Sequence, residues 1–455
     1  MSSDTPNVLL VILDSARARN TSFHGYHRRT TPFLDSFADS ATRYTQARAP
    51  AGWSLPSHAS IFTGALPQEH GVNALGTKLD DDTSVFEWLS DEGYATGLFT
   101  DNTYLTDLDT GLSNGFDVVL NDKDPFPSGI SPAAFAEEEG TDRVAFLRAA
   151  IESDAPVPSL LNGATWMLKW HVPQLTAGAV FTRGFTYAEH FAEWRETTDG
   201  PWAACVNLMD THVPFRPDDE YDEWASDDTR SARKSVAEDD VGEGEEWKYA
   251  LQQNRYDGTI RQADAVIERI VDSLRSAGEL NETLVVITAD HGEGFGERTP
   301  VTGDLATGHG DGTSESLLHV PLVVRAPGQH DGTVIENPVG LVDFPDVVRT
   351  VVDGGSPDFD TDRTVFAGGL TDGDAVDVAY ERHESVGVSK YVRIGDNAWT
   401  VHAPDPRVNY LHDEGAPTSV VEEMASLSDA GVARDADVAV SEAAHQQLEA
   451  LGYTK

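Results

Sequence analysis

The chain has 455 residues, of which 39% are hydrophobic, so it is long enough to bury a large core. It carries 77 acidic side chains against 32 basic ones, a formal net charge of −45 that is spread along the whole sequence. This charge argues against binding to a nucleic-acid backbone, which requires clustered lysine and arginine. It predicts a protein from a halophile, because molar salt screens the repulsion between the acidic groups.

Cysteine and apolar segments restrict the cellular setting. Cys205 is the only cysteine, so no intramolecular disulfide can form, and its apolar neighbours predict a buried thiol. No segment approaches the roughly 20 apolar residues of a membrane helix. The short apolar run near the N-terminus lacks the basic flank of a secretion signal. We therefore expect a cytoplasmic protein without stable membrane insertion.

Five continuous apolar runs predict strands that are buried on both faces. In chain order they are Val8–Leu13, Ala95–Thr100, Trp202–Leu208, Leu284–Thr288 and Pro321–Arg325. Helical patterns lie between them, and the clearest covers Tyr256–Ala277, followed by Gly278 as a stop signal. Strands that alternate with helices predict an α/β sheet covered on both sides.

The pattern changes to short extended segments after about residue 354. The segments Val388–Ile394 and Ala398–His402 flank Gly-Asp-Asn, which predicts a hairpin. Further on, Ser441–Leu451 has the pattern of a closing helix.

These changes predict two structural units. Residues 1–354 form the larger, catalytic domain, and residues 355–455 form a smaller C-terminal α+β subdomain. Within the first unit, residues 121–200 have weak periodicity and several aromatic side chains. We expect this stretch to be an insertion that forms a lid over the site.

Polar side chains follow three of the predicted strands. They are Asp14, Asp210, and Asp290 together with His291. Ligands of open α/β sheets bind at the carboxyl ends of the strands, and an adjacent carboxylate and imidazole make a natural metal-binding pair. The alternatives are that Asp14 caps the next helix and that Asp290 and His291 form a hydrogen-bonded turn.

The strongest local signal is the segment Trp53–Gly64. Ser54 stands two residues before a proline, where a short helix can begin and run to Gly64. A hydroxyl at a helix N-terminus faces free N–H groups and the positive end of the helix dipole, which stabilise an alkoxide, phosphate or sulfate. The alternative is that Ser54 only caps this helix.

Together these segments resemble the sulfatase family of the alkaline phosphatase-like superfamily. The matching motifs are NVLLVILDSAR at 7–17, GYHRRTTPFLD at 25–35, SLPSHASIFTG at 54–64, HVPFRP at 212–217, DHG at 290–292 and HVPLVV at 319–324. The resemblance implies a three-layer α/β/α alkaline phosphatase-like fold with a mostly parallel central sheet. It also implies a metal-dependent hydrolase of sulfate or phosphate esters.

The resemblance implies a metal site and a nucleophile. Asp14, Ser54, Asp290 and His291 would hold one divalent cation, and Ser54 would attack the ester. This ligand set favours Mn²⁺ or Zn²⁺ over Ca²⁺, because imidazole is a poor ligand for the harder calcium ion.

The resemblance also implies roles for further side chains. His212 and His309 would act as acid, base or oxyanion donors near the ester oxygen. Arg17 would either bind the anionic group or pair with an acid. A second metal held by Asp210, His212 and His309 is conceivable but not favoured.

Two departures from the family pattern affect the expected reaction. His58 stands where the motif that is converted to formylglycine has arginine, and Ser15 stands where a second acid often follows Asp14. We therefore predict that Ser54 remains a plain serine and that phosphate esters are preferred.

The substrate is expected to be a small-molecule, glycan or lipid ester. One alternative is a phosphoglycerol- or phosphoethanolamine-type transferase on the same fold. Another is a non-catalytic binding protein, against which the complete set of Asp14, Ser54, Asp290 and His291 argues.

Overall fold

The protein is described here as a computed structural model. The described residues are 5–120, 129–130, 132, 135, 143–153, 155–171, 184–225, 247–299, 301, 303, 305–310, 312–371, 374–383, 387–402 and 411–436. The predicted closing helix Ser441–Leu451 lies outside these residues.

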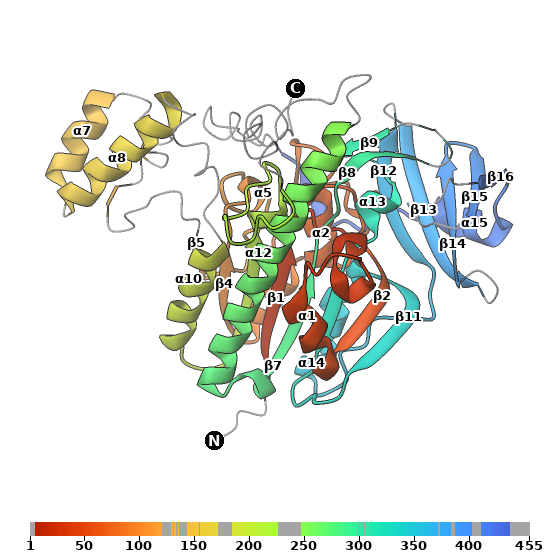
Figure 1. Ribbon diagram of the computed structural model, residues 1–455, viewed down its shortest axis with the longest axis horizontal. Helices are drawn as coiled ribbons and strands as arrows, with labels where there is room; N and C mark the ends of the chain where they lie inside the picture. Colours follow the sequence, from red (N-terminus) through yellow and green to blue (C-terminus); the bar gives the residue numbers. More distant parts are fainter. Residues whose placement is uncertain are drawn as a thin grey trace.

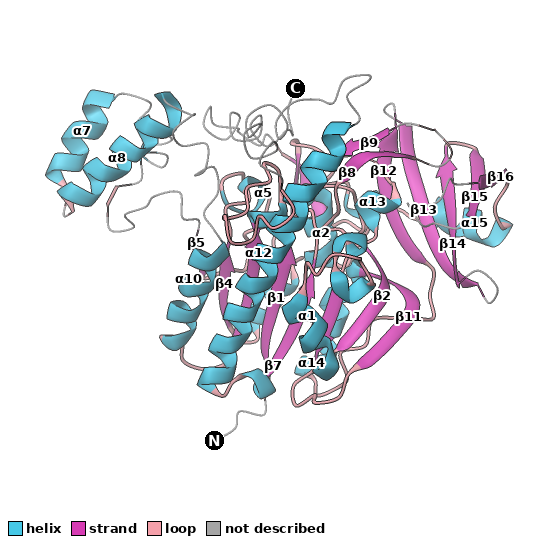
Figure 2. Cartoon of the chain, in the orientation of Figure 1, coloured by secondary structure: helices cyan, strands magenta, loops and turns pink. Residues whose placement is uncertain are grey.

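An eight-stranded sheet forms the centre of the molecule (Figures 1 and 2). Its strands, in spatial order, are β11 (Thr333–Gly340), β2 (Thr42–Arg48), β10 (Leu322–Arg325), β7 (Thr283–Thr288), β1 (Asn7–Leu13), β6 (Trp202–Leu208), β4 (Ala95–Phe99) and β5 (Val118–Leu120). Every residue of β1, β6 and β7 is buried, as the continuous apolar runs predict.

The sheet is mostly parallel. The central strand β1 runs parallel to β6 and β7, and β4 runs parallel to β6 and β5. Only β10 is antiparallel to its neighbours β2 and β7, which its apolar run alone does not reveal. The parallel order brings the carboxyl ends of β1, β6, β7 and β4 to the same edge of the sheet.

Helices cover the sheet in two groups. Figure 1 shows α1 (Pro32–Phe37), α10 (Gly184–Glu196) and α12 (Trp247–Ala277) in front of the strands, where α12 contacts the other two. The helices α2 (Ser54–Thr63), α4 (Val85–Asp91) and α14 (Phe344–Val352) form the second group. The three-layer α/β fold expected from the sequence is therefore confirmed. The predicted helix at 256–277 begins nine residues earlier, at Trp247.

The region predicted as an insertion contains helices of two kinds. The helix α10 packs against α12, β4 and β6, so it belongs to the body of the fold. The helices α7 (Arg143–Glu152) and α8 (Pro156–His171) pack against each other and stand away from the body (Figure 1). A lid over the site stays a prediction.

A second, antiparallel sheet lies in the C-terminal part of the chain. Its five strands are β12 (Val365–Thr371), β13 (Asp374–His383), β14 (Gly387–Ile394), β15 (Asn397–His402) and β16 (Leu411–Glu414). The hairpin of β14 and β15 confirms the sequence prediction, and α15 (Thr418–Ser426) packs on this sheet. The division of the chain at residue 354 falls between α14 and β12 and stays a prediction.

The remaining elements are short. Two two-stranded sheets pair β3 (Thr77–Leu79) with β17 (Ala433–Asp435) and β8 (Gly294–Arg298) with β9 (Leu305–Gly308). The short helices are α3 (Pro67–His70), α5 (Thr103–Thr106) and α13 (Glu315–Leu318). Cys205 is buried in β6 without a disulfide partner, and burial raises the pKa of its thiol, as expected of a structural cysteine.

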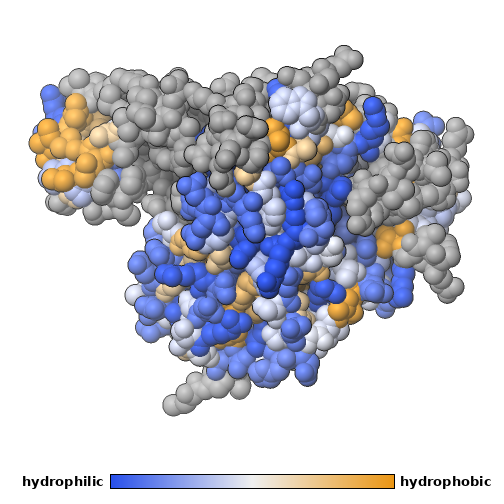
Figure 3. All heavy atoms as spheres, in the orientation of Figure 1, coloured by the Kyte–Doolittle hydropathy of each residue, from blue (hydrophilic) through white to orange (hydrophobic). Residues whose placement is uncertain are grey.

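The acidic surface leads to a prediction about salt. Hydrophilic side chains dominate the face of the body in Figure 3, and the formal net charge is −45. Raising the salt concentration from about 0.1 M to about 1 M shortens the screening length from roughly 10 Å to roughly 3 Å, which weakens the self-repulsion. We expect the melting temperature to rise by about 5 °C, on the order of 5 kcal/mol for a chain of this length, over this range. A melting temperature that stays constant or falls in differential scanning calorimetry contradicts a halophilic origin.

Within the described part of the chain, no helix has the length and apolar character needed to span a lipid bilayer.

Candidate metal and catalytic site

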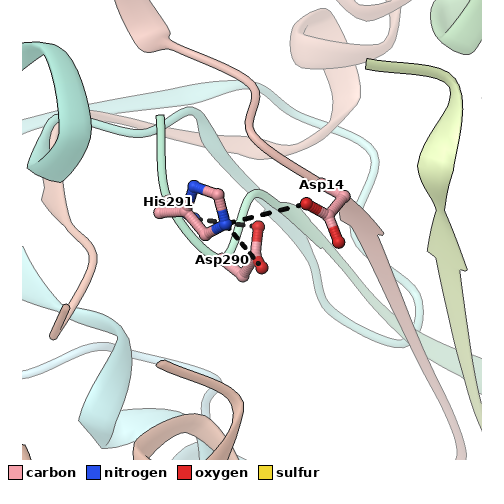
Figure 4. A group of neighbouring side chains, drawn as sticks. All are labelled: Asp14, Asp290 and His291. Atoms are coloured by element: carbon pink, nitrogen blue, oxygen red, sulfur yellow. Dashed lines mark hydrogen bonds and ion pairs between the residues drawn. The ribbon is translucent and has the colours of Figure 1, made fainter. Parts of the chain in front are cut away.

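Two carboxylates and one imidazole meet at the carboxyl edge of the central sheet (Figure 4). Asp14 directly follows β1, and Asp290 and His291 follow β7, the parallel neighbour of β1. The Nε2 atom of His291 lies 3.3 Å from Oδ2 of Asp290 and 3.7 Å from Oδ1 of Asp14. All three side chains are fully buried.

The hydrogen bonds of this group fit a bound cation. Nδ1 of His291 lies 2.8 Å from the carbonyl oxygen of Gly292, to which it donates, so Nε2, which faces the two carboxylates, is the ring nitrogen left to bind a metal. Oδ2 of Asp290 is buried and makes no hydrogen bond to the described residues. Acceptor atoms that face one another in a buried space require a positive charge between them.

Amide and hydroxyl groups orient Asp14. Its Oδ2 atom accepts hydrogen bonds from Asn102 at 2.9 Å and Asn207 at 3.3 Å, and its Oδ1 atom accepts one from the hydroxyl of Ser15 at 3.2 Å. Asn102 is itself fixed because its Oδ1 atom caps α5 by accepting from Tyr104 N. These three donors orient the carboxylate of Asp14, which does not act as a helix cap.

The charges of the two carboxylates are coupled. Burial raises the pKa of Asp14, but the imidazoles of His212 and His291 lower it by more, so this group is readily ionised. Burial and the nearby charge of Asp14 raise the pKa of Asp290. A divalent cation would remove this repulsion and allow both groups to be ionised together.

Ser54 is the first residue of α2, and its hydroxyl faces the carboxylate and imidazole group. Its Oγ atom lies 3.3 Å from Nε2 of His291. The N-cap position is occupied by Trp53, and Gly64 ends the helix in the left-handed conformation with φ +78°. The sequence therefore predicts the extent of the helix correctly, and the alternative of Ser54 as a simple cap is wrong.

Two further histidines stand beside His291. The ring of His309 is 4.9 Å from that of His291 and 4.6 Å from that of His212, measured between ring centroids. Nδ1 of His309 lies 3.0 Å from Oε2 of Glu293. Burial lowers the pKa of His309, but the Glu293 carboxylate raises it by more, whereas burial lowers the pKa of His212 to about 4. The surroundings thus shift the pKa values of the two imidazoles in opposite directions, favouring the protonated form of His309 and the neutral form of His212.

Asp210 and Arg17 are held by other partners. Asp210 lies in the 3-10 helix Met209–Thr211, and its carboxylate accepts hydrogen bonds from Gln262 Nε2 at 2.6 Å and from Gly184 N at 3.0 Å. It is not part of the carboxylate and imidazole group, so the geometry gives no support to a second metal at this residue. The buried Arg17 donates from Nη2 to Glu297 at 2.5 Å, which agrees with the acid-pairing alternative for Arg17.

A tyrosine from α12 holds the loop that follows Asp14. The hydroxyl of Tyr256 donates to the carbonyl oxygen of Ser15 at 2.7 Å and accepts from the N–H of Arg17 at 2.8 Å. Ser15 has φ +66°, an uncommon conformation for a residue other than glycine, and its N–H donates to Asp290 Oδ1 at 3.2 Å. Tyr256 therefore stabilises the strained turn at Ser15, which follows Asp14 and is hydrogen-bonded to Asp290.

Replacing Tyr256 with phenylalanine should weaken metal binding by about tenfold, because two buried backbone groups lose their partner and the turn relaxes. Isothermal titration with Mn²⁺ measures this change. Tyr94→Phe is the matched control, because the hydroxyl of Tyr94 bonds the carbonyl oxygen of Pro6 at the opposite end of β1. Equal affinities in the two variants would contradict a positioning role for Tyr256.

Two cavities share a wall that the C-terminal sheet provides. One, of about 270 Å³, is lined by His309 and by Val376, Val392 and Ile394 of the C-terminal sheet. The other, of about 280 Å³, is lined by Trp53 and again by Val376. The C-terminal sheet therefore contributes walls to both cavities, and Ser54 is not among the residues that line them.

The chain is similar to known arylsulfatases. The chain is 22% identical over 417 residues to arylsulfatase D of Homo sapiens and 23% identical over 378 residues to arylsulfatase K of Bos taurus. The matches cover 76% and 75% of this chain but 65% and 61% of those two relatives, so the chain spans less than two thirds of their length.

Solved structures share the fold at low identity. A protein of the alkaline phosphatase superfamily from Vibrio parahaemolyticus superimposes with a TM-score of 0.57 at 12% identity, covering 94% of this chain and 86% of that one. A phosphonate monoester hydrolase of Agrobacterium radiobacter gives a TM-score of 0.53 at 19% identity, covering 92% and 90%. The family model named Sulfatase matches residues 6–353. The chain therefore belongs to the sulfatase family.

Proposed function

We propose that the protein hydrolyses phosphate or sulfate esters with Ser54 as the nucleophile. The observation that carries the proposal is the position of the Ser54 hydroxyl, at the N-terminus of α2 and 3.3 Å from Nε2 of His291. We assign Asp14, Asp290, His291 and Ser54 as ligands of one divalent cation. Mn²⁺ or Zn²⁺ suits this set better than Ca²⁺, although Ca²⁺ also binds carboxylates.

The residues divide the reaction between them. A bound cation lowers the pKa of a ligating hydroxyl and neutralises a nonbridging oxygen of the ester. Ser54 Oγ, after losing its proton to solvent, attacks in line as the bond to the alcohol oxygen breaks, and the positive end of the α2 dipole favours the anionic group. His309, held by Glu293, donates a proton to the oxygen of the departing alcohol. Neutral His212 then accepts a proton from the water that cleaves the serine ester.

The cavity beside His309 suits the alcohol part of the substrate. Its walls combine apolar side chains of the C-terminal sheet with the imidazole that serves as the acid. An alcohol that leaves into this cavity would receive its proton directly from His309, and the proton would not pass through solvent.

An unmodified Ser54 favours phosphate over sulfate. A sulfated formylglycine hydrate expels sulfate when its second hydroxyl loses a proton, whereas a plain serine has no second hydroxyl. A phosphoserine can instead be hydrolysed by a second in-line attack. His58 supports an unmodified serine, because it stands where the motif that is converted to formylglycine has arginine.

We expect turnover of p-nitrophenyl phosphate to exceed that of p-nitrophenyl sulfate by at least about tenfold, a difference of about 1.4 kcal/mol in transition-state stabilisation. The assay uses the metal-loaded protein in high salt, with Ser54→Ala as the control for contaminating hydrolases. Peptide mass spectrometry across Ser54 should show the mass of serine.

Two results would overturn this preference. One is a loss of about two mass units at Ser54, the two hydrogens removed when serine becomes the aldehyde form of the nucleophile. The other is faster turnover of the sulfate ester, which would show that the enzyme prefers sulfate esters to phosphate esters.

A further inference from the structure

The helices α7 and α8 expose large apolar side chains. On α7, Leu147 and Ile151 are 49% and 63% exposed, four residues apart. On α8, Val157, Leu160 and Leu161 are 64%, 36% and 41% exposed, at spacings of three and four residues. Each helix therefore presents one apolar stripe to the outside. We call these five side chains the outer stripe. Figure 3 shows hydrophobic atoms gathered where Figure 1 places these helices.

The buried positions of the same two helices are small or polar. Ala150, Ser159 and Asn162 are each at most 1% exposed. The hydroxyl of Ser159 donates to the carbonyl oxygen of Ala155 at 2.8 Å and accepts from the N–H of Ile130 at 2.9 Å. The amide of Asn162 donates to the carbonyl oxygen of Ile130. Phe146 of α7 also packs on Gly163 of α8, but the buried residues described on this pair are small or polar, as they are between helices that contact lipid.

The charge of this segment also differs from the rest of the chain. Residues 155–188 form a run of 34 residues without a single Asp or Glu, although the chain has 77 acidic residues among 455. On α7, exposed Arg148 lies next to Leu147 of the outer stripe. Elsewhere the acidic surface repels both an anionic lipid headgroup and a second copy of this chain. At α8 a membrane can approach without desolvating a carboxylate of that helix, and on α7 the exposed side chains of Arg148 and Glu152 flank the apolar surface.

We propose that α7 and α8 dock the protein on the surface of a lipid bilayer, with the outer stripe at the boundary between headgroups and acyl chains. Helices of 10 and 16 residues are too short to cross the bilayer, so they would lie in its plane. This property is independent of the ester hydrolysis proposed above, because none of the residues of the outer stripe belongs to the candidate site.

Flotation with phosphatidylcholine vesicles, with and without phosphatidylglycerol, tests the proposal in high salt. The full chain should float with the vesicles. The double variant Ile151→Asp/Leu160→Asp should lose at least about tenfold in partition coefficient for each side chain changed. Val334→Asp is the matched control, because Val334 is 50% exposed on β11 of the large sheet. Its partition should equal that of the unchanged chain.

Folding and self-association are measured on the same samples. The hydrolysis of a soluble aryl ester by the double variant should be unchanged, and Val157→Ser offers a milder change should that variant misfold. Absence of flotation by the unchanged chain, or equal flotation by the variants at 151 and 160, overturns the proposal. So does a dimer in analytical ultracentrifugation that the double variant dissociates, because the outer stripe would then be covered by a second copy.

Discussion

Replacing Ser54 with alanine is expected to lower the turnover of an aryl ester by at least about 10³-fold, because no other hydroxyl takes over a covalent step. Ser54 is buried at the first turn of α2, and Asp14, Asp290 and His291 remain in place without it. The variant should therefore still fold and retain much of its metal. Initial rates, metal content and the melting temperature, measured on the same preparation, separate these effects.

Ser60→Ala is the matched control for this experiment. Ser60 is a buried serine of the same helix, and its hydroxyl bonds Nε2 of His70 at 2.9 Å, away from the carboxylate and imidazole group. Its loss should change turnover by less than about tenfold, the effect of one neutral hydrogen bond. If Ser54→Ala retained turnover close to that of Ser60→Ala, the nucleophile would be water and the proposed covalent step would be wrong.

Glu315→Ala is expected to destabilise the protein by about 3–5 kcal/mol, the usual effect of removing one partner from a buried ion cluster. Glu315 belongs to α13, and its fully buried carboxylate lies 3.1 Å from Arg48 of β2 and 3.0 Å from Lys390 of β14. The hydroxyl of Tyr380, on β13, donates to the same carboxylate at 2.5 Å. Without Glu315, two buried cations face each other, and the ion pairs that link β2 to β14 through α13 are lost.

The same cluster predicts a dependence on pH. Burial raises the pKa of Glu315, but Arg48 and Lys390 lower it by more, to about 2 against an ordinary value of 4.5. A depressed pKa in the folded state stabilises the fold above the ordinary pKa. This contribution is lost as the pH falls through about 2. Stability should therefore fall less steeply below pH 4.5 in Glu315→Ala than in the unchanged chain.

Denaturant unfolding at several pH values measures both effects. Asp272→Ala is the control, because Asp272 pairs with Arg275 on the exposed side of α12 and should contribute less than about 1 kcal/mol. A loss in Glu315→Ala no larger than in Asp272→Ala would show that the buried cluster does not hold the two sheets together.

Continuous apolar strands are the part of the fold that is predictable from the sequence. The runs that form β1, β6 and β7 are buried on both faces, so their apolar residues are consecutive. Such a run can be recognised as a strand without knowing which strands pair with it. Asp14, Asp290 and His291 follow from the same argument, because the carboxyl ends of parallel strands lie at one edge. By contrast, β8 and β9 are short, rich in glycine and partly exposed, so their pairing has no comparable signal.

The residues that orient the site depend on contacts far apart in sequence. Asn207 is a polar residue inside the buried strand β6, which is a usable signal, but its partner Asp14 is 193 positions away. Glu293 stands in the Asp-His-Gly-Glu sequence, yet its bond to His309 exists only because β8 and β9 pair. For Asp210 the strand-end argument points to a site residue that the structure does not bring to the metal-binding group. Asp210 follows a strand as Asp14 does, but its carboxylate is hydrogen-bonded to Gln262 of α12.

Val376 of β13 lines both the cavity that contains His309 and the cavity that contains Trp53, although it belongs to the antiparallel sheet and not to the sheet that carries Asp14, Asp290 and His291. A change at Val376 or at Ile394 would reshape the space offered to an alcohol and leave every oriented polar atom of the reaction centre in place. Natural selection can therefore vary which ester is accepted by substituting residues in the last quarter of the chain. The same separation makes β13 and β14 the place to begin when the substrate range of this protein is to be altered by directed evolution.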